Sequence, residues 1–466
     1  MKMDNKKKWF PSVYTILFLM MIFAAVLTWI VPAGSYERVT EDGVTKVIAG
    51  TYHVIDQNPR GPWHIFQALV TGFKNQSSLI YMILFVGAAV HMITETKAID
   101  TIFMKLAKAV KGKEEIAIFC VMLFMSLGGA TGVFGNATLV LIPIGIFLSQ
   151  AMGFDKTLGF FMIFFGQFSG FNVGWANAGV LGVAQSIAEV PLFSGFTARV
   201  IFHIVNFTLS YLFVIHYLHQ IKKDSTKSLN YSGENVNVMG QPNGELEDAQ
   251  VTKVQILAML CLVAGLIAVI IGALKFKWGA DKISATFLVV CFMIGCVSCK
   301  DMNEGFNRFI KGCAGTVNAA FIVGFANAMT VLMNGGMILD TIVYWLSKPI
   351  SSMGSVLGAG FMFLANAVIN FFISSGSGQA AAVMPIMVPI ADLTGITRQV
   401  AVQAFQFGDG FTNCVIPTIG TLMGGLGFAG ISYGKYLKKA MPLVGVQIVL
   451  AFCTIMFLQS IGWTGL

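Results

Sequence analysis

The chain has 466 residues, of which 56% are hydrophobic and 11% are charged, and its mean hydropathy is +0.76. A water-soluble fold could not cover so much apolar side chain with polar surface. The net charge of +8 does not indicate nucleic-acid binding, because the basic residues gather in short clusters beside apolar runs, as they do in the cytoplasmic loops of membrane proteins.

Runs of about 20 apolar residues recur along the chain, and each could cross a hydrocarbon core of roughly 30 Å. The first run is too long for a cleavable signal peptide, so we expect it to be retained. The run 116–152 is too long for one span and is broken by "GGATGVFGN". A re-entrant hairpin that enters and leaves on the cytoplasmic side keeps the basic loops inside. The spans predicted in this half are 13–32, 77–97, 157–188 and 195–220.

The polar segment 221–252 lacks periodic apolar positions, which predicts a flexible cytoplasmic linker between two transmembrane halves, 1–220 and 253–466. The run 352–393 is broken by "SSGSGQ" and, by the same charge argument, forms a second hairpin entered from outside. We therefore expect an all-α polytopic membrane protein with about nine transmembrane helices, a cytoplasmic N-terminus and an external C-terminus. The spans predicted in the second half are 253–273, 283–299, 316–336, 398–428 and 436–460.

The two halves also match in sequence. The hairpins carry "GNATLVLIP", from Gly135, and "GQAAAVMP", from Gly378. The segments "QFSGFNVGWANAG", from Gln167, and "QFGDGFTNCVIPTIG", from Gln406, follow them in the same order. Matched segments in halves of opposite orientation predict an inverted-topology repeat, which is typical of secondary transporters.

The broken segments are the expected substrate site, because irregular backbone at membrane depth is tolerated only where it lines a cavity or is buried in protein. A helix beginning near Gln379 would direct its positive end toward an anionic group or a carbonyl oxygen. Asn136 and Gln379 are equivalent across the repeat and are expected to face one substrate from opposite tips. The same polar residues could instead only bond neighbouring helices. The predicted substrate-binding residues are Asn136, Thr138, Asn172, Asn177, Ser374, Ser375, Ser377, Gln379, Thr412 and Asn413.

Asp409 is the only carboxylate in either broken helix, where an acid is costly and tends to mark an ion or substrate path. It is expected to bind Na⁺ together with carbonyl groups of the segment around Gly408 and Gly410, to take up a proton, or to hold an ammonium group of the substrate. No cofactor is expected apart from a coupling ion, Na⁺ or H⁺, and the sequence does not identify a metal beyond the possible Na⁺ near Asp409.

Two further residues are assigned structural roles. Arg199 is expected to form an ion pair with Glu189 at the outer rim. His203, one turn further along, is expected to make a hydrogen bond between helices.

The chain resembles the YfcC family, which is grouped with the DcuC-like anaerobic C4-dicarboxylate carriers in the ion transporter superfamily. The resemblance runs from "FPSVYTILFLMMIFAAVLTWIVPAG" to the end and is strongest in "NFFISSGSGQAAAVMPIMVPIADLTGITRQVAVQAFQFGDGF". It implies a bacterial inner-membrane carrier with an inverted-repeat fold, and it leaves a homodimer open. The family includes carriers suggested for C4-dicarboxylates and others suggested for basic amino acids, including arginine/ornithine exchange.

One departure from the family bears on the substrate. Members thought to carry basic amino acids often have two Glu at the first hairpin tip, where this chain has Asn136 and Ala137. Losing both carboxylates removes a partner for a guanidinium or ammonium group, which favours a carboxylate or zwitterionic substrate.

The sequence thus predicts a secondary active transporter, an ion-coupled symporter or an exchanger, of small organic anions such as C4-dicarboxylates or of amino acids. A basic amino acid antiporter and, more distantly, a passive channel remain as alternatives. An enzyme is not expected, because no G-x-S-x-G frame or partnered His accompanies the serines of the second tip. The expected partners are a small-molecule substrate and the lipid bilayer.

Overall fold

The computed structural model describes residues 13–41, 44–48, 50–98, 112–231, 251–276 and 278–465, and the side chain of Asn136 lies outside this described set. Helix α1 (Val13–Ile30) leads into two small antiparallel sheets, β1 (Gly34–Ser35) with β4 (His53–Val54) and β2 (Arg38–Glu41) with β3 (Val44–Val47). These strands correct the all-α expectation. They form where β-branched Val and Thr residues replace the long apolar runs.

Helix α2 (Pro62–Asn75) was not expected from the sequence. Its 14 residues are too few to span a membrane. It is amphipathic, with Ile65 and Ala68 buried and Trp63 and Val70 exposed. Helix α3 (Ser77–Glu95) follows almost without interruption and coincides with the second predicted span.

The next elements form a series of helices with two interruptions. The first interruption, between α5 and α6, falls where the sequence predicts the first hairpin tip. The second divides the predicted span 157–188, because the backbone turns at Gly174, whose φ is +58°. The series comprises α5 (Glu114–Ala130), η1 (Gly135–Ala137), α6 (Thr138–Ala151), α7 (Lys156–Phe171), η2 (Ala178–Gly182), α8 (Val183–Ile187) and α9 (Phe196–Lys223).

The middle of the chain contains the longest helix. Helix α12 has 34 residues and begins 14 positions before the predicted span at 316, because Asp301 caps it by accepting a 2.8 Å hydrogen bond from the amide of Glu304. Residues 232–250 of the predicted linker lie outside the described residues. The elements here are η3 (Ser225–Lys227), α10 (Lys253–Phe276), α11 (Ala280–Ser298), α12 (Met302–Gly335), α13 (Leu339–Ser347) and η5 (Lys348–Ser352).

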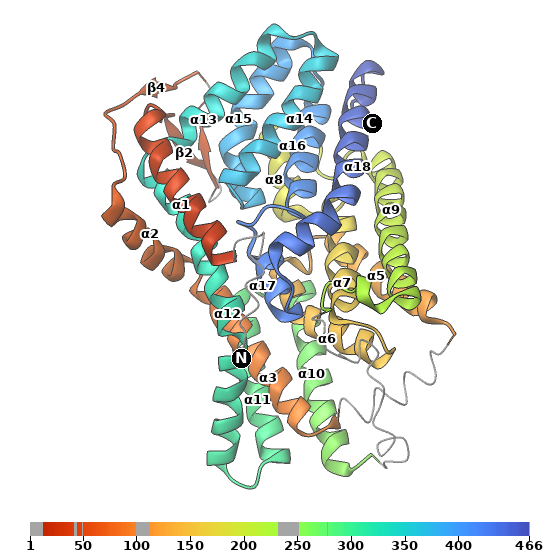
Figure 1. Cartoon of the computed structure of the whole chain (residues 1–466). Coiled ribbons are helices and arrows are strands. Elements are labelled where there is room, and N and C mark those ends of the chain that lie inside the picture. Colours follow the sequence, from red (N-terminus) through yellow and green to blue (C-terminus); the bar gives the residue numbers. More distant parts are fainter. Residues whose placement is uncertain are drawn as a thin grey trace.

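A second series follows, with interruptions at the corresponding places. The chain breaks after α14 at residues 373–375, within the predicted second hairpin, and again after α16 at residues 413–419, within the predicted span 398–428. The elements are α14 (Ser355–Phe372), α15 (Gly376–Thr394), α16 (Arg398–Thr412), α17 (Gly420–Ala429) and α18 (Tyr433–Ser460). In Figure 1, α13, α14 and α15 lie at one end of the molecule and the turn between α11 and α12 lies at the other.

Close helix contacts hold both series together. A methyl group added at Gly170 of α7 would collide with the carbonyl oxygen of Ser126 in α5. In the second series, a methyl at Gly408 of α16 would lie 2.5 Å from Cβ of Asn366 in α14. Small residues let the two helix backbones approach at these crossings.

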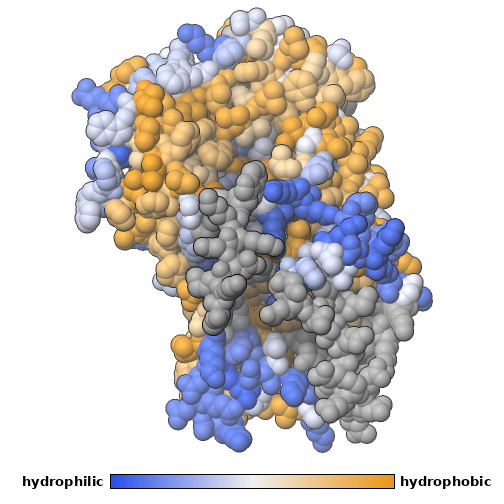
Figure 2. Space-filling model, viewed as in Figure 1, coloured by the Kyte–Doolittle hydropathy of each residue, from blue (hydrophilic) through white to orange (hydrophobic). Residues whose placement is uncertain are grey.

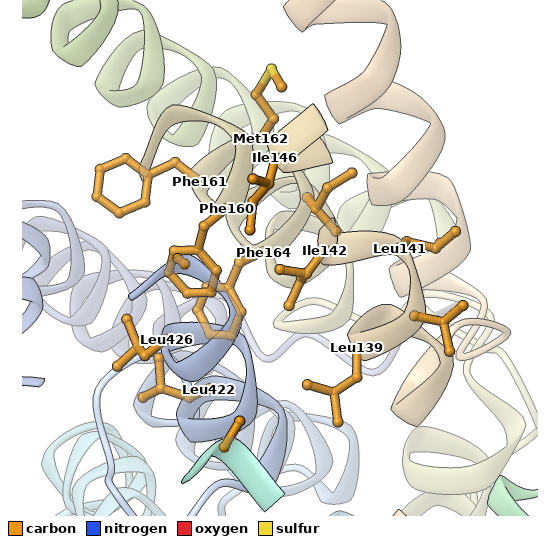
Figure 3. Close-up of a cluster of buried hydrophobic side chains, with 14 of the residues drawn as sticks. Leu139, Leu141, Ile142, Ile146, Phe160, Phe161, Met162, Phe164, Leu422 and Leu426 are labelled. Atoms are coloured by element: carbon orange, nitrogen blue, oxygen red, sulfur yellow. The ribbon is translucent and has the colours of Figure 1, made fainter. Parts of the chain in front are cut away.

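A large apolar core lies between the two series. Figure 3 shows side chains of α6, α7 and α17 pointing toward one another, among them Leu139, Ile142, Phe160, Phe164 and Leu422. All five are at most 1% exposed. This packing joins helices from both halves of the chain into one body.

The outer surface is strongly apolar. Hydrophobic residues cover most of the upper part of the face shown in Figure 2, and hydrophilic residues gather at its lower end, where α11 and α12 join, and in patches at the right and upper left edges. Helices such as α10 and α18 expose rows of apolar side chains, including Leu260 and Val449. Such a belt fits a lipid bilayer and not water.

The described residues include seven helices that are long and apolar enough to cross a membrane. Six of them coincide with predicted spans, and the seventh is α14, which was predicted as one arm of a hairpin. The remaining predicted spans are the shorter helix α1 and the two interrupted segments 157–188 and 398–428. The protein is therefore a mostly helical, polytopic membrane protein.

Candidate functional site

A cavity of about 430 Å³ lies where the interrupted helices meet. Both predicted tips reach it, the first through Gly135 and the second through the segment 374–377. Both later interruptions contribute as well, through Phe171 and Val180 on one side and through Asn413 and residues 418–421 on the other. The fold thus brings four breaks that are far apart in the sequence to one polar space.

Four of the ten predicted substrate-binding residues line this cavity, namely Ser374, Ser375, Ser377 and Asn413. The hydroxyl of Ser375 caps α15 by accepting a 3.4 Å hydrogen bond from the amide of Gly378. The first turn of α15 therefore faces the cavity with its amide groups.

The other predicted residues whose side chains the structure describes do not line the cavity. Asn177 caps the helix that follows it by accepting hydrogen bonds from the amides of Gly179 and Val180, at 3.1 and 3.2 Å. Thr412 donates to the carbonyl oxygen of Gly408 at 2.6 Å. Thr138 and Asn172 are buried behind the cavity wall. Asn136 was predicted to face the substrate, but its side chain is outside the part of the chain that the structure describes.

Gln379 also points away from the cavity. It is fully buried, and its Nε2 donates to the carbonyl oxygen and to Oδ1 of Asn366, at 3.0 and 3.2 Å. It therefore ties α15 to α14 across the break. Gln379 therefore does not face the cavity as expected, because its carboxamide is held by Asn366 of α14.

Asp409 lies directly behind the N-terminus of α15. Its side chain is fully buried, and neither carboxylate oxygen accepts a hydrogen bond of good geometry in the described part of the chain, although the side chain of Asn413 interacts with the carboxylate. A methyl group added at Gly376, the first residue of α15, would lie 2.9 Å from Oδ2 of Asp409. The acid thus faces the positive end of this helix dipole, which favours a negative charge.

Asn370 connects Asp409 to the cavity wall. Its Nδ2 donates to the carbonyl oxygen of Asp409 at 2.9 Å, to the hydroxyl of Thr412 at 2.8 Å and to Oδ1 of Asn413 at 2.8 Å. One carboxamide of α14 therefore fixes the last turn of α16. A change in the cavity at Asn413 would reach the backbone of Asp409 through this residue.

The buried polar groups around the two broken helices contain an excess of acceptors. In the described part of the chain, several carbonyl oxygens of buried carboxamides have no donor, whereas the amide nitrogens of four of these groups are bonded. A buried acceptor without a protein donor is unusual, and such groups are places where water, a proton or a cation can bind. These oxygens are Oε1 of Gln167, Oδ1 of Asn172, Oδ1 of Asn370, Oε1 of Gln379 and Oε1 of Gln406, beside both oxygens of Asp409.

The sequence-based prediction did not include two carboxamide residues that line the cavity. Gln76, between α2 and α3, and Asn327, in the middle of α12, both line the cavity. Nδ2 of the adjacent Asn75 donates to Oδ1 of Asn327 at 3.4 Å. Asn327 could have been noticed as a carboxamide within a long apolar helix. It was missed because it lies outside the segments that match between the two halves.

No charged side chain lines the described part of the cavity. The first residues of α15 and of α17, Gly376 and Gly420, both reach it. Two helix N-termini therefore contribute positive partial charge to a wall of hydroxyl and carboxamide groups. This arrangement suits a small polar ligand that carries negative charge. Among the described residues, no cluster of His, Cys, Asp or Glu could hold a metal ion.

The prediction of an ion pair between Arg199 and Glu189 is wrong. Glu189 is bound by Arg398, with Nη1 and Oε2 2.7 Å apart, and Arg398 also contacts Asp392 at 2.8 Å. Arg199 lies on α9 with its side chain fully buried. Arg199 was predicted to pair with Glu189 because the two are close in the sequence. Arg398, at the start of α16, takes that place because its partly exposed side chain reaches Glu189 at the rim.

His203 bonds between helices, as predicted. Its Nε2 lies 2.6 Å from the hydroxyl of Ser126, and its Nδ1 accepts a 2.8 Å hydrogen bond from Nε1 of Trp175. The ring therefore joins α9 to α5 and to the break after α7.

The fold and the cavity define a polytopic membrane protein with a polar site between interrupted helices. The family model described as the C4-dicarboxylate anaerobic carrier, DcuC, matches residues 10–460, and the chain belongs to this family of membrane transporters. The expected resemblance is thereby confirmed. The chain is 28% identical to the YfcC protein of Escherichia coli (strain K12), whose name suggests basic amino acid antiport, over 98% of each chain.

Other similarities are more distant. An uncharacterised protein of Haemophilus influenzae (strain ATCC 51907 / DSM 11121 / KW20 / Rd) is 26% identical over 97% of each chain. The YdaH transporter of Alcanivorax borkumensis superposes with a TM-score of 0.40 at 15% identity, covering 98% of this chain and all 100% of that one. MtrF of Neisseria gonorrhoeae gives a TM-score of 0.41 at 16% identity, covering 97% and 95%.

Proposed function

We propose that this transporter is a secondary active carrier of small organic anions, such as C4-dicarboxylates, which bind in the cavity between the interrupted helices. The observation that supports this most is that the N-termini of α15 and α17 meet at a cavity whose described lining has no acidic side chain. Helix N-termini bind carboxylates through free amide groups and the helix dipole. The hydroxyl of Ser374 and the carboxamide of Gln167 would orient the ligand.

Asp409 is the coupling residue in this proposal. Its carboxylate and Oδ1 of Asn370, whose Nδ2 bonds the backbone of Asp409, have no hydrogen-bond donor in the described part of the chain. Na⁺ suits such a set, because hard cations take oxygen ligands, whereas one proton would satisfy only one contact. Na⁺ is therefore the preferred driving ion and a proton the alternative.

The two helix series support an inverted repeat as the basis of transport. Each has an interrupted hairpin, a broken helix and a final helix, and α9 and α18 both have 28 residues. In the proposed bacterial inner-membrane topology, the N-terminus is cytoplasmic, the C-terminus is external, and the first hairpin opens to the cytoplasm and the second to the outside. Repeats of opposite orientation allow alternating access to one central site.

Basic amino acid antiport is the second candidate, and it is favoured by the name of the Escherichia coli relative. The cavity gives it less support, because Asp409 lies behind Gly376 and the described lining offers a guanidinium no carboxylate. A passive channel would need a continuous polar path, whereas the polar groups found here are gathered at one cavity.

Proteoliposomes would test the proposal. Vesicles preloaded with unlabelled succinate should accumulate labelled succinate transiently, and an inward Na⁺ gradient should drive net uptake. Competition by aspartate, arginine and ornithine should identify the substrate class. Labelled arginine exchanging in place of succinate would favour the second candidate, and flux without counterflow would indicate a channel.

Asp409→Asn separates coupling from binding in the same assay. The variant should lose Na⁺-driven accumulation while the folded yield stays near that of the unchanged protein. Asp392→Asn is the matched control, because Asp392 is an exposed acid at the other end of α15. Equal Na⁺-driven accumulation by both variants would remove Asp409 from the mechanism.

A further inference from the structure

Arg199, in the first turn of α9, is a buried cation without a compensating charge in the described part of the chain. Its side chain is 0% exposed, and Nε, Nη1 and Nη2 all lack hydrogen-bond partners there. Its guanidinium carbon lies 5.9 Å from the ring centre of Trp463. An unpaired buried charge is very costly in free energy, so native proteins rarely keep one without a partner.

Two contacts identify the part of α16 that faces this arginine. A methyl group added at Gly195, just before α9, would lie 2.9 Å from Nε2 of Gln399. Further along, the rings of Phe202 and Phe407 have centroids 5.9 Å apart. Arg199 lies between Gly195 and Phe202 in the sequence. On α16, Gln403 lies halfway between Gln399 and Phe407. Because both helices run in the same direction between these contacts, Gln403 lies level with the arginine.

Gln403 has the same unusual environment as the arginine. It is fully buried, and neither its Nε2 nor its Oε1 has a partner among the described residues. The residues next to it on α16, such as Val400 and Ala404, belong to a buried apolar cluster that also includes Leu458 of α18. Two buried side chains with unpaired donor groups thus lie at the same level of neighbouring helices, in surroundings that exclude bulk water.

A small anion would resolve both problems together. It would neutralise the guanidinium and accept charge-assisted hydrogen bonds from it and from the Gln403 amide. The N-terminus of α9 adds a favourable dipole at the same place. None of these residues lines the cavity of the interrupted helices, so the two sites are distinct.

We propose that Arg199 and Gln403 form a buried binding site for a small monovalent anion, which joins the beginning of α9 to α16. The anion is either an inorganic halide or the carboxylate of a small solute, since both have the required charge and accept hydrogen bonds. Its bound state stabilises the end of the bundle where these two helices begin.

Thermal unfolding of the purified protein tests this site. Sodium chloride, bromide and formate are titrated against sodium gluconate at constant ionic strength, because gluconate is much bulkier than the three test anions. The melting temperature should rise and saturate with chloride and bromide if the ligand is a halide, or with formate alone if it is a carboxylate. A melting temperature that responds to none of these anions would overturn the proposal.

Variants locate the effect. Arg199→Gln should abolish the anion response, whereas Arg398→Gln, which changes a partly exposed arginine at the same end, should retain it. Gln403→Leu should raise the half-saturating anion concentration several-fold, and it serves as the second variant if Arg199→Gln does not fold. An anion response that is unchanged in Gln403→Leu or in Arg199→Gln would contradict the assignment. Crystals grown in bromide should show anomalous density beside the guanidinium if the halide is bound.

Discussion

The contact between the second hairpin tip and Asp409 can be tested with one methyl group. Gly376 begins α15, and its φ lies outside the left-handed region. Alanine therefore causes no backbone strain there. The new methyl would lie 2.9 Å from Oδ2 of Asp409 and 3.0 Å from both γ-carbons of Val180. Such distances are too short, so the tip, the acid or both must move.

Overpacking of this kind costs about 1–3 kcal/mol. Because about 1.4 kcal/mol corresponds to a factor of ten, Gly376→Ala should weaken the apparent affinity for substrate or Na⁺ by about 5- to 140-fold. Initial uptake into proteoliposomes, measured over a range of both concentrations and normalised to folded protein, gives these affinities.

Gly445→Ala is the matched control, because it adds the same methyl within another helix, α18, at a position that does not line the cavity. No neighbouring side chain or other helix lies within 4 Å of that methyl. Its affinities should remain within about 2-fold, a change of roughly 0.4 kcal/mol. Indistinguishable uptake by the two alanine variants would refute the role given to the contact between Gly376 and Asp409.

Three further predictions concern other parts of the molecule. Asn413→Ala removes the oxygen that accepts a 2.8 Å hydrogen bond from Asn370. In the same uptake assay, the apparent substrate affinity should fall by about 2- to 12-fold, which corresponds to about 0.5–1.5 kcal/mol. An unchanged affinity would exclude Asn413 from the site. Burial raises the pKa of Asp155, between α6 and α7, above its ordinary value of 3.8. The folded state therefore binds the carboxyl proton of Asp155 more tightly than the unfolded state does. The stability that this proton contributes is lost as the pH rises from 3.8 through the folded-state pKa. Melting curves of Asp155→Asn should lack this part of the pH dependence, and curves that keep it would assign the dependence to other groups. In a cysteine-free background, cysteine at the exposed Thr226 should react with an impermeant maleimide only from the cytoplasm, and cysteine at the exposed Ser352 only from outside; the reverse pattern would overturn the proposed topology.

The sequence by itself determined the membrane class, the family and most of the helices. These properties depend on local composition, since a run of apolar residues must span lipid wherever its neighbours lie. The interruptions were also predictable, because "GGATGVFGN" and "SSGSGQ" cannot continue an apolar helix. The proposed role of Asp409 rests on the cost of an acid at that depth, whereas its position behind Gly376 was not predictable.

Only the tertiary structure decided which polar side chains face the cavity. Gln379 and Ser377 are two residues apart, yet the first bonds Asn366 and the second lines the cavity. Their directions depend on how α15 is rotated against α14, which is set by packing between distant segments. Arg199 was assigned to Glu189 because the two are close in the sequence, but Arg398, more than 200 residues away, takes that partner. Ion pairs and cavities depend on which helices meet, and a single sequence does not record that.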